Sequence, residues 1–383
     1  MPPNNSLPTS HRSAELTPAS NPISTIRINQ VAPVPAIPKT GTFTLIKVLS
    51  TSLNPVDYKL ASLPYPLPRL MIGAAPHTPG LDFVGRVWST NDSRLKGGDI
   101  VWGLVPATAR EGAAADFVVV KGDGWGGKIP EGWLDMASKT GRELEELGTF
   151  GVCGFTAFQA LLKGDLGFSQ TWNKRGAGRD MGRGGKVFIN GGSGGVGSFM
   201  VQIAKRGFGC ESVVATCSGA NADLVRSLGA DEVVDYRNTS VVGALKEWSM
   251  KNGGQQFDLI IDNVGSSEIY YQCHNFLKPG SEGGKYVMVG AGMSLAATRD
   301  IAMMLLLPGF LGGGQRPVGF FGLTSVPQDQ WELCGKWMLE GRVKAVIEDE
   351  NRFDLDDIQK AFQKLHGGRT RGKIVVHVAK EGQ

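Results

Sequence analysis

The chain has 383 residues, 41% of them hydrophobic and 20% charged, a composition typical of a globular protein with a large buried core. Its length favours two domains. The formal net charge of +4 gives no indication of a nucleic-acid partner, and the longest apolar run, 301–311, is broken by Pro308 and too short to span a bilayer.

The N-terminus and the cysteines bear on where the protein resides. Residues 1–22 are polar, rich in Pro and Ser, and contain no apolar signal-peptide core, so they are predicted to form a flexible tail. The expected location is the cytoplasm; a mitochondrial transit peptide is the alternative, although basic residues are few. No Cys-x-x-Cys pair occurs, and widely spaced reduced thiols are expected at Cys153, Cys210, Cys217, Cys273 and Cys334.

The first part of the chain, 23–150, is predicted to be β structure. It is rich in β-branched residues, and Pro and Gly interrupt it at short intervals. The expected strands are 42–50, 83–89, 99–105 and 115–120. This pattern predicts an antiparallel, barrel-like domain.

The character of the sequence changes at Gly151, where short apolar strands begin to alternate with helices. Such alternation predicts an α/β domain with a parallel doubly wound sheet over 151–342. The segment 343–383 holds a helix and the strand GKIVVHV, and is predicted to return to the first domain. The expected strands of the parallel sheet are 186–190, 212–216, 232–236, 257–262, 285–290 and 318–323.

A glycine-rich turn, 191–197, separates the first of these strands from the helix that follows it. Gly192, Gly194 and Gly197 fit the pattern G-x-G-x-x-G. Glycine permits a tight turn and close approach of backbone N–H groups to a phosphate, and the start of a helix adds positive potential. Between a strand and a helix, this turn predicts dinucleotide binding.

The end of the second strand indicates which dinucleotide. An acidic side chain there usually accepts the ribose hydroxyls of NAD and repels the 2′-phosphate of NADP. The stretch 213–221 contains no Asp or Glu, and its small hydroxyl and amide groups can donate hydrogen bonds to a phosphate. The sequence therefore favours NADPH. Arg226 and Arg237 are further candidates for the phosphate, or solvated surface residues.

Two segments permit more than one interpretation. The insert 169–185 contains Lys174, Arg175, Arg179 and Arg183 and few apolar residues, so it is either a flexible surface loop or a basic rim for an anionic substrate or carrier. The apolar stretch 301–310 and the pair Phe320-Phe321 could line a substrate pocket or form a homodimer interface.

Seven motifs occur in an order that resembles the medium-chain dehydrogenase/reductase superfamily, in its zinc-independent quinone-reductase branch with fungal members and reticulon-4-interacting proteins. The resemblance implies a GroES-like catalytic domain built from both chain ends, with a Rossmann domain between them. The motifs are NPVDYK (54–59), PGLDFVGRV (79–87), GFTAFQALL (154–162), GGSGGVG (191–197), LGADEVVDYR (228–237), FDLIIDNVG (257–265) and RGKIVVHV (371–378).

The resemblance also implies which residues bind NADPH. The pyrophosphate would lie on the turn residues Gly192, Ser193, Gly194, Gly195 and Val196. The 2′-phosphate would lie near Ser218, Asn221 and Tyr236. The remaining implied contacts are Thr156 at the nicotinamide, Asn263 and Val264 at its ribose, and Lys373 at a cofactor phosphate. Thr156 as a helix cap and Tyr236 as an aromatic residue at the rim are the alternatives.

Zinc-dependent relatives bind the metal through Cys, His and Cys. The positions that match these ligands are Asn54, Leu81 and Cys153. One thiol does not make a tetrahedral site, and no cysteine precedes Cys153 to build a four-cysteine structural lobe. We therefore expect no zinc.

Three functions are consistent with these features. The first is NADPH-dependent reduction of small quinones or α,β-unsaturated carbonyl compounds, with Asn54, Lys59, Tyr65 or water as the donor to the developing oxyanion. Lys59 and Tyr65 match donors of related enoyl reductases, or are a surface lysine and a loop tyrosine. The second is a fungal-type enoyl reductase that works in trans with a polyketide synthase. The third is a cofactor-binding protein that acts through partners and has little turnover.

Overall fold

The computed structural model describes residues 7–63, 67–72, 76–122, 124–164, 185–290, 318–320 and 326–379. Predictions for Tyr65, the basic insert up to residue 184, 301–310 and Phe321 lie outside these residues. The chain forms two compact units: unit 1 comprises 1–153, 325–340 and 345–383, and unit 2 comprises 154–324 and 341–344.

The described part of unit 2 contains a parallel sheet of six strands in the order β10-β9-β8-β11-β12-β13. Numbered from the first strand of this unit, the order is 3-2-1-4-5-6, so the predicted Rossmann topology is confirmed. The strands are β8 (Lys186–Asn190), β9 (Ser212–Cys217), β10 (Glu232–Asp235), β11 (Leu259–Asp262), β12 (Lys285–Met288) and β13 (Val318–Phe320).

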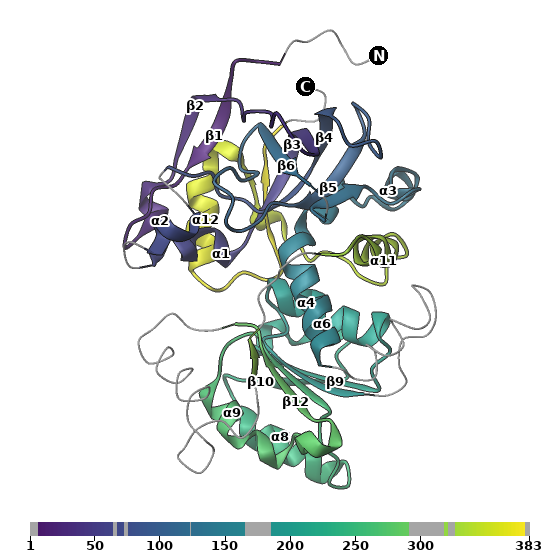
Figure 1. The fold of residues 1–383 in the computed structure, drawn as a ribbon. Helices are drawn as coiled ribbons and strands as arrows, with labels where there is room; N and C mark the ends of the chain where they lie inside the picture. The colour runs from purple at the N-terminus through teal and green to yellow at the C-terminus, as the bar shows by residue number, and fades with distance from the viewer. Residues whose placement is uncertain are drawn as a thin grey trace. The chain divides into compact units, whose positions relative to one another are not determined.

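A row of aligned apolar residues crosses this sheet and faces two helices. Phe188, Val214, Ile260 and Tyr286 lie side by side in the register of the strands, on one face. Helices α8 (Val241–Lys251) and α9 (Ser267–Gln272) pack against this row in a single hydrophobic cluster. Helix α6 (Gly195–Gln202) covers the opposite face (Figure 1), and α7 (Ala222–Ser227) follows β9. Coverage of both faces explains why the inner residues of these strands are mainly apolar.

Unit 1 contains a mainly antiparallel sheet in the order β14-β15-β3-β4-β5-β7, with β6 paired to β3. The predicted β-rich domain is therefore confirmed. The described strands are β3 (Phe43–Leu53), β4 (Asp82–Thr90), β5 (Ile100–Leu104), β6 (Phe117–Lys121), β7 (Gly126–Lys128), β14 (Arg352–Asp354) and β15 (Ile374–His377).

The C-terminal segment completes unit 1, as expected from the sequence. Strand β15 pairs with β3, and helix α12 (Ile358–His366) lies beside the N-terminal elements (Figure 1). Helix α1 (Pro55–Lys59) meets α12 where Tyr58 packs edge-on against Phe362, at 6.4 Å between ring centroids. The two ends of the chain thus share one hydrophobic core.

The expectation of a flexible tail over 1–22 is wrong for part of that range. Residues Ser10–Glu15 form strand β1, which pairs with β2 (Arg27–Pro33). The Arg12 side chain binds the Asp116 carboxylate at 2.9 Å, and the backbone N–H of Ala14 donates to the Ala114 carbonyl at 2.9 Å. Ala14 and Leu16 are completely buried, so this segment gains stability from long-range packing.

The boundary expected at residue 342 also differs from the observed one. Helix α11 (Gln328–Leu339) belongs to unit 1, where Trp331 packs edge-on against Trp102 at 4.9 Å between centroids. The helix brings Gly335 close to the ring of Pro130. Residues 341–344 group with unit 2, where the Lys344 backbone exchanges two hydrogen bonds with the Gln202 side chain, each 2.9 Å long.

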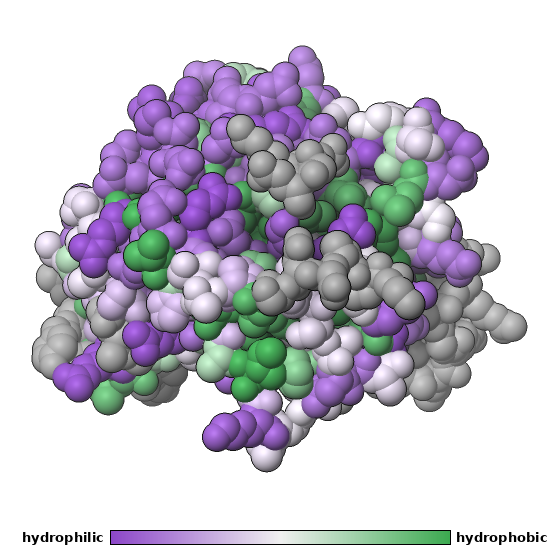
Figure 2. Space-filling model, turned by 90° about the horizontal axis from the view of Figure 1, so that it is seen from above, coloured by the Kyte–Doolittle hydropathy of each residue, from purple (hydrophilic) through white to green (hydrophobic). Residues whose placement is uncertain are grey.

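The surface of the described residues carries isolated apolar side chains. The face drawn in Figure 2 is mainly hydrophilic, with apolar residues in small separate patches. Val31, Leu70 and Met250 are each more than 70% exposed and belong to three different elements, β2, α2 (Leu67–Ile72) and α8. Such scattered exposure is ordinary. Among the helices described, none has the length and apolar character needed to cross a membrane.

Candidate functional site

The glycine-rich turn of unit 2 connects β8 to α6. Gly191 has a φ of +87°, in the left-handed region that favours glycine. Its N–H donates to the Thr216 hydroxyl at 2.8 Å, and the N–H of Gly192 donates to the Thr216 carbonyl at 2.7 Å. The turn is therefore fixed to the end of β9 before the helix begins at Gly195.

The three glycines of the G-x-G-x-x-G pattern have different surroundings. A Cβ on Gly192 would lie 3.0 Å from the Cβ of Ala215, and a Cβ on Gly197 would collide with the carbonyl of Gly191. Those two glycines permit close packing of helix, turn and strand. A Cβ on Gly194 would meet no atom within 4 Å. The absence of a side chain there leaves open space beside the first N–H groups of α6, which have no partner within the helix.

A buried network holds the carboxyl ends of three strands together. Asp262, at the end of β11, is fully buried and accepts hydrogen bonds from the Asn190 amide at 2.8 Å and the Tyr286 hydroxyl at 2.8 Å. Asn190 in turn accepts a hydrogen bond from the Thr216 hydroxyl at 2.7 Å. The turn at Gly191 is thereby connected through Thr216 and Asn190 to β11.

The same carboxylate orders the turn after β11. It accepts hydrogen bonds from the backbone N–H groups of Val264 at 2.9 Å, Gly265 at 2.9 Å and Ser266 at 2.6 Å. Val264 is 57% exposed, and its Cγ2 lies 3.1 Å from where a Cβ on Gly191 would be. The predicted residues Asn263 and Val264 therefore lie beside the glycine turn.

Asn263 has an unused acceptor. Its Oδ1 atom is buried and has no hydrogen-bond partner among the described residues, although its Nδ2 lies 3.8 Å from the sulfur of Met200. A buried amide oxygen without a donor is costly, and such an atom at the switch point of a doubly wound sheet suits the hydroxyl of a bound ribose. Together with the open space at Gly194, this orphaned atom fits a dinucleotide.

The residues predicted for the 2′-phosphate gather at the end of β9. Ser218 is buried, and the Asn221 amide donates to the Ser193 hydroxyl of the glycine turn at 3.2 Å. Tyr236 is 53% exposed, and its backbone N–H donates to the Cys217 carbonyl at 3.2 Å. The structure thus brings the three residues predicted for the 2′-phosphate together at the carboxyl ends of β9 and β10.

One acidic residue also reaches this edge. The Asp235 carboxylate lies against Gly219, where an added Cβ would be 2.6 Å from Oδ2. Asp235 accepts hydrogen bonds from the Arg237 backbone at 3.0 Å and the Asn238 amide at 2.7 Å. Arg226 forms an ion pair with Asp223 at 3.1 Å. The stretch 213–221 has no acid of its own, but the third strand supplies one nearby.

Two further predicted residues lie elsewhere. Thr156 is 8% exposed within helix α4 (Gly151–Lys163), so it is not a cap at the start of that helix. Lys59 is half-buried at the end of α1. Their predicted roles stay predictions, as does that of Tyr65, which is outside the described residues.

A second polar centre lies wholly in unit 1, around Lys373. This lysine is 2% exposed. Its ammonium donates to Asn54 Oδ1 at 2.6 Å, to Asp82 Oδ2 at 3.2 Å, to the Leu53 carbonyl at 3.3 Å and to Cys153 Sγ at 3.4 Å. Burial lowers the pKa of Lys373, but the Asp82 carboxylate and the hydrogen bonds to Asp82 and Cys153 outweigh burial, and the net direction is upward. The side chain is thus a buried cation.

Asp82 is the anionic partner of that cation. It accepts hydrogen bonds from the Ser52 hydroxyl at 2.9 Å, the Asn54 amide at 2.9 Å and, at the start of α4, the Val152 N–H at 2.6 Å. Burial raises the pKa of the Cys153 thiol, so the thiol is held neutral beside this ion pair. The sequence pattern did not single out Asp82, although it lies in the PGLDFVGRV motif.

A second buried carboxyl group fixes the position of Asn54. Asp57 accepts hydrogen bonds from the Asn54 N–H at 2.6 Å and the Gly80 N–H at 3.1 Å. Burial raises the pKa of Asp57 to about 7. The three residues thereby join the start of α1 to the loop before β4.

Two residues with predicted site roles, Lys373 and Asn54, lie in this centre, and those roles stay predictions. Lys373 is expected beside a cofactor phosphate; in the structure its ammonium is directed into the buried cluster because Asp82 requires a counter-charge. Asn54 is expected to donate to a substrate carbonyl; in the structure it is 1% exposed and its amide hydrogens are directed at Asp82 and at the Ser52 carbonyl, 3.4 Å away. The side chains of both residues make their hydrogen bonds inside unit 1.

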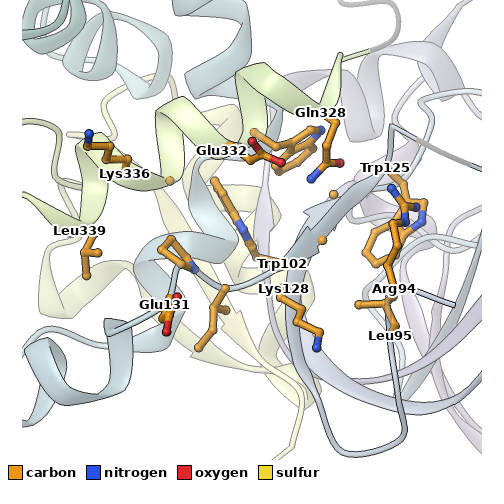
Figure 3. Close-up of a pocket in the computed structure, with 16 residues that line it drawn as sticks. Arg94, Leu95, Trp102, Trp125, Lys128, Glu131, Gln328, Glu332, Lys336 and Leu339 are labelled. Carbon is orange, nitrogen blue, oxygen red and sulfur yellow. The ribbon is translucent and has the colours of Figure 1, made fainter. Parts of the chain in front are cut away.

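Unit 1 also has a pocket of about 440 Å³ between β7 and α11, which we call the tryptophan pocket (Figure 3). Trp102, Trp125 and Trp331 line it, together with charged residues such as Lys128 and Glu332. None of the residues predicted from the sequence lines it. The pocket is therefore a candidate site for an apolar ring, and the residues of the Lys373 centre do not line it.

Comparison with known proteins gives consistent matches. A family model described as zinc-binding dehydrogenase matches residues 228–376. The trans-enoyl reductase pgmF of Aspergillus terreus is 38% identical over 349 residues, which cover 87% of this chain and 86% of that protein. The mitochondrial NAD(P)H oxidoreductase RTN4IP1 of Bos taurus is 32% identical over 361 residues, which cover 87% of this chain and 81% of that protein.

A solved structure matches the fold of nearly the whole chain. The quinone oxidoreductase of Escherichia coli, complexed with NADPH, superposes with a TM-score of 0.68 at 18% identity, covering 96% of this chain and 100% of that one. At this identity the likeness shows the fold alone.

Proposed function

Since this chain belongs to the medium-chain dehydrogenase/reductase superfamily, and is thus an oxidoreductase dependent on NAD(P), we propose that it reduces quinones and other α,β-unsaturated carbonyl compounds with NADPH. The premise rests on relatives of 38% and 32% identity that align along most of the chain. The observation that carries the proposal is the corner at Gly194, with its open space, its helix N-terminus and the orphaned Asn263 oxygen.

The choice of NADPH over NADH rests on the end of β9. Ser218, Asn221 and Tyr236 offer hydroxyl and amide groups to a 2′-phosphate, and Asn221 is oriented by Ser193. Asp235 opposes this choice, but its carboxylate already accepts two hydrogen bonds from its own turn. The E. coli quinone oxidoreductase of the same fold was solved with NADPH, which supports the assignment.

When bound, NADPH would supply a hydride to an electron-poor carbon of the substrate. Negative charge would then develop on the substrate oxygen, which needs a donor. Lys59, half-buried at the end of α1, and Tyr65 are the candidates, with water as the remaining proton source. Asn54 is not proposed for this role because its amide is engaged with Asp82.

A second candidate function is an enoyl reductase that acts in trans with a polyketide synthase. The 38% identity to the trans-enoyl reductase pgmF favours it. The chemistry is the same hydride addition to an activated double bond, but the substrate is a thioester on a carrier protein. The insert with Lys174 and Arg183 offers positive charge to such a carrier.

The test is NADPH oxidation against a panel of free quinones, free enones and enoyl thioesters. Turnover of quinones and enones supports the first function, and turnover restricted to thioesters supports the second. Tight NADPH binding without turnover of any member would contradict both, and would leave the role of a cofactor-binding partner protein. NADH should be at least tenfold less effective than NADPH in the same assays.

We further propose that the protein works in the cytoplasm. The five cysteines are buried and none of them is in a disulfide, in keeping with a reducing compartment. Imaging of a C-terminal fluorescent fusion tests this location, and a mitochondrial signal would contradict it. A homodimer is proposed on the sequence of 301–310 and Phe320-Phe321; light scattering of the purified chain tests it.

A further inference from the structure

The description of the matching family implies zinc, and the positions that match its ligands can be compared with the structure. They are Asn54, Leu81 and Cys153, and only Cys153 carries a side chain that zinc commonly takes. Among the described residues, no group of three or more His, Cys, Asp or Glu side chains is arranged to hold a metal ion. The residues present therefore do not fit zinc.

The place between two of these positions is taken by a lysine. The Lys373 ammonium lies 2.6 Å from Asn54 Oδ1 and 3.4 Å from Cys153 Sγ. Asp82, the neighbour of Leu81, approaches the same nitrogen at 3.2 Å. An ammonium has three hydrogens and no lone pair, so each of these atoms offers its electrons to Lys373.

We propose that Lys373 is the resident cation of this centre and excludes a divalent metal from it. Side chain and backbone atoms that could coordinate a metal instead solvate the ammonium, and the Asp82 carboxylate balances its charge. The inference concerns the protein alone and does not depend on which substrate the enzyme reduces.

The charges of Lys373 and Asp82 explain why this centre retains the lysine and does not take up a metal ion. Removing one partner of a buried ion pair leaves an uncompensated buried charge, which is strongly destabilising. Lys373 and Asp82 are 2% and 0% exposed, so neither charge can turn to solvent. A divalent ion that entered beside the ammonium would add two further positive charges to one carboxylate, which electrostatic repulsion disfavours.

The same geometry makes a specific variant informative. Lys373→Ala removes the cation and leaves Asn54 Oδ1, Asp82 Oδ2 and Cys153 Sγ around a vacated, negatively charged space. Three such donors with an open position are the number that a catalytic metal site uses. We therefore expect K373A to bind a divalent metal that the unmodified chain does not bind.

The probe is Co²⁺, because a cobalt–thiolate bond gives a charge-transfer band in the near ultraviolet. As this bond forms, the Cys153 thiol loses its proton to the buffer. Titration of K373A should produce this band with about one equivalent of Co²⁺ and at least tenfold tighter than any binding by the unmodified chain. K373R keeps the cation and should give no band. K373A/C153S removes the thiol and should lose the band. Metal analysis of the unmodified protein should find no stoichiometric zinc.

K373A could unfold without metal, so thermal melting gives an independent measurement. The Tm of K373A should rise with Co²⁺, whereas the Tm of the charge-neutral pair K373M/D82N should not change. A cobalt–thiolate band in the unmodified protein as strong as that of K373A would overturn the proposal. So would a K373A protein that is folded by circular dichroism, shows no band and does not gain stability from Co²⁺.

Discussion

Asp262 Oδ1 accepts a hydrogen bond of 2.8 Å from the side-chain amide of Asn190, and this bond joins the carboxyl ends of the first and fourth strands of the parallel sheet. The strand order reverses at these two strands, and doubly wound sheets bind their ligands at such a reversal. Side-chain hydrogen bonds therefore hold together the strand ends next to the glycine turn, in addition to the backbone hydrogen bonds between β8 and β11.

Asp262→Asn should destabilise the protein and weaken NADPH binding. The carboxylate accepts five hydrogen bonds, and an amide would replace one accepting oxygen by a donor, leaving buried donors unsatisfied at about 1–3 kcal/mol each. We expect the Tm to fall by several degrees and calorimetric titration to show at least tenfold weaker NADPH binding. D135N, at an exposed carboxylate on α3 (Trp133–Thr140) of unit 1, is the control and should change neither quantity.

Substitution by alanine should have different effects at Gly194 and at Gly197. Gly194 has a φ of −79° and open space around it, so Gly194→Ala should fold normally but place its methyl group where a pyrophosphate would lie. We expect an unchanged Tm and at least tenfold weaker NADPH binding. Gly197→Ala should instead lower the Tm, because its Cβ collides with the Gly191 carbonyl and overpacking costs about 1–3 kcal/mol. Wild-type NADPH affinity in G194A would contradict the proposed position of the cofactor.

The glycine turn could be predicted because its signal is local: the strand, turn and helix are consecutive, and each glycine has a reason within the same short segment. The polar residues that hold the turn in place give a weaker signal in the sequence. Asn190, Thr216 and Asp262 are each a polar residue at the end of an apolar strand, but only the sheet order shows that they meet.

Lys373 shows what the sequence alone could not reveal. Its motif, RGKIVVHV, resembles a family segment near the cofactor, and the lysine was predicted there. The structure pairs Ile374 with Leu53 across β15 and β3, which places Lys373 beside Asn54, 319 positions away. Strand β1 is a similar case, because the polar segment Ser10–Glu15 acquires its partners from residues near 114–116. Pairings over such separations depend on the whole topology.

Tyr236→Ala should reduce the preference for NADPH over NADH. Tyr236 is 53% exposed and follows β10, and its hydroxyl is proposed to bind the 2′-phosphate that NADH lacks. We expect the ratio of the two dissociation constants to shrink about tenfold, or ~1.4 kcal/mol, with little change for NADH. Titration calorimetry with both cofactors measures this ratio. Tyr271→Ala, at a 38% exposed tyrosine on α9, should leave it unchanged, and equal affinities in the unmodified protein would defeat the argument for NADPH.

A pH-dependent contribution to stability is expected from His377. Its Nε2 donates to the Glu145 carboxylate at 2.8 Å, and this hydrogen bond raises the pKa of His377. Because the folded-state pKa lies above the unfolded value of about 6.5, the contribution is fully present below that pH and is lost as the pH rises through the folded pKa.

The effect should be small because the His377 side chain is 45% exposed and solvent screens the pair. We expect the Tm of the unmodified protein to fall about 1–3 °C more between pH 6 and pH 8 than that of His377→Asn. His366→Gln, which removes a histidine from α12 in the same unit, should retain the full pH dependence. Identical pH profiles for the unmodified protein and H377N, in buffers of equal ionic strength, would show that the pair does not stabilise unit 1.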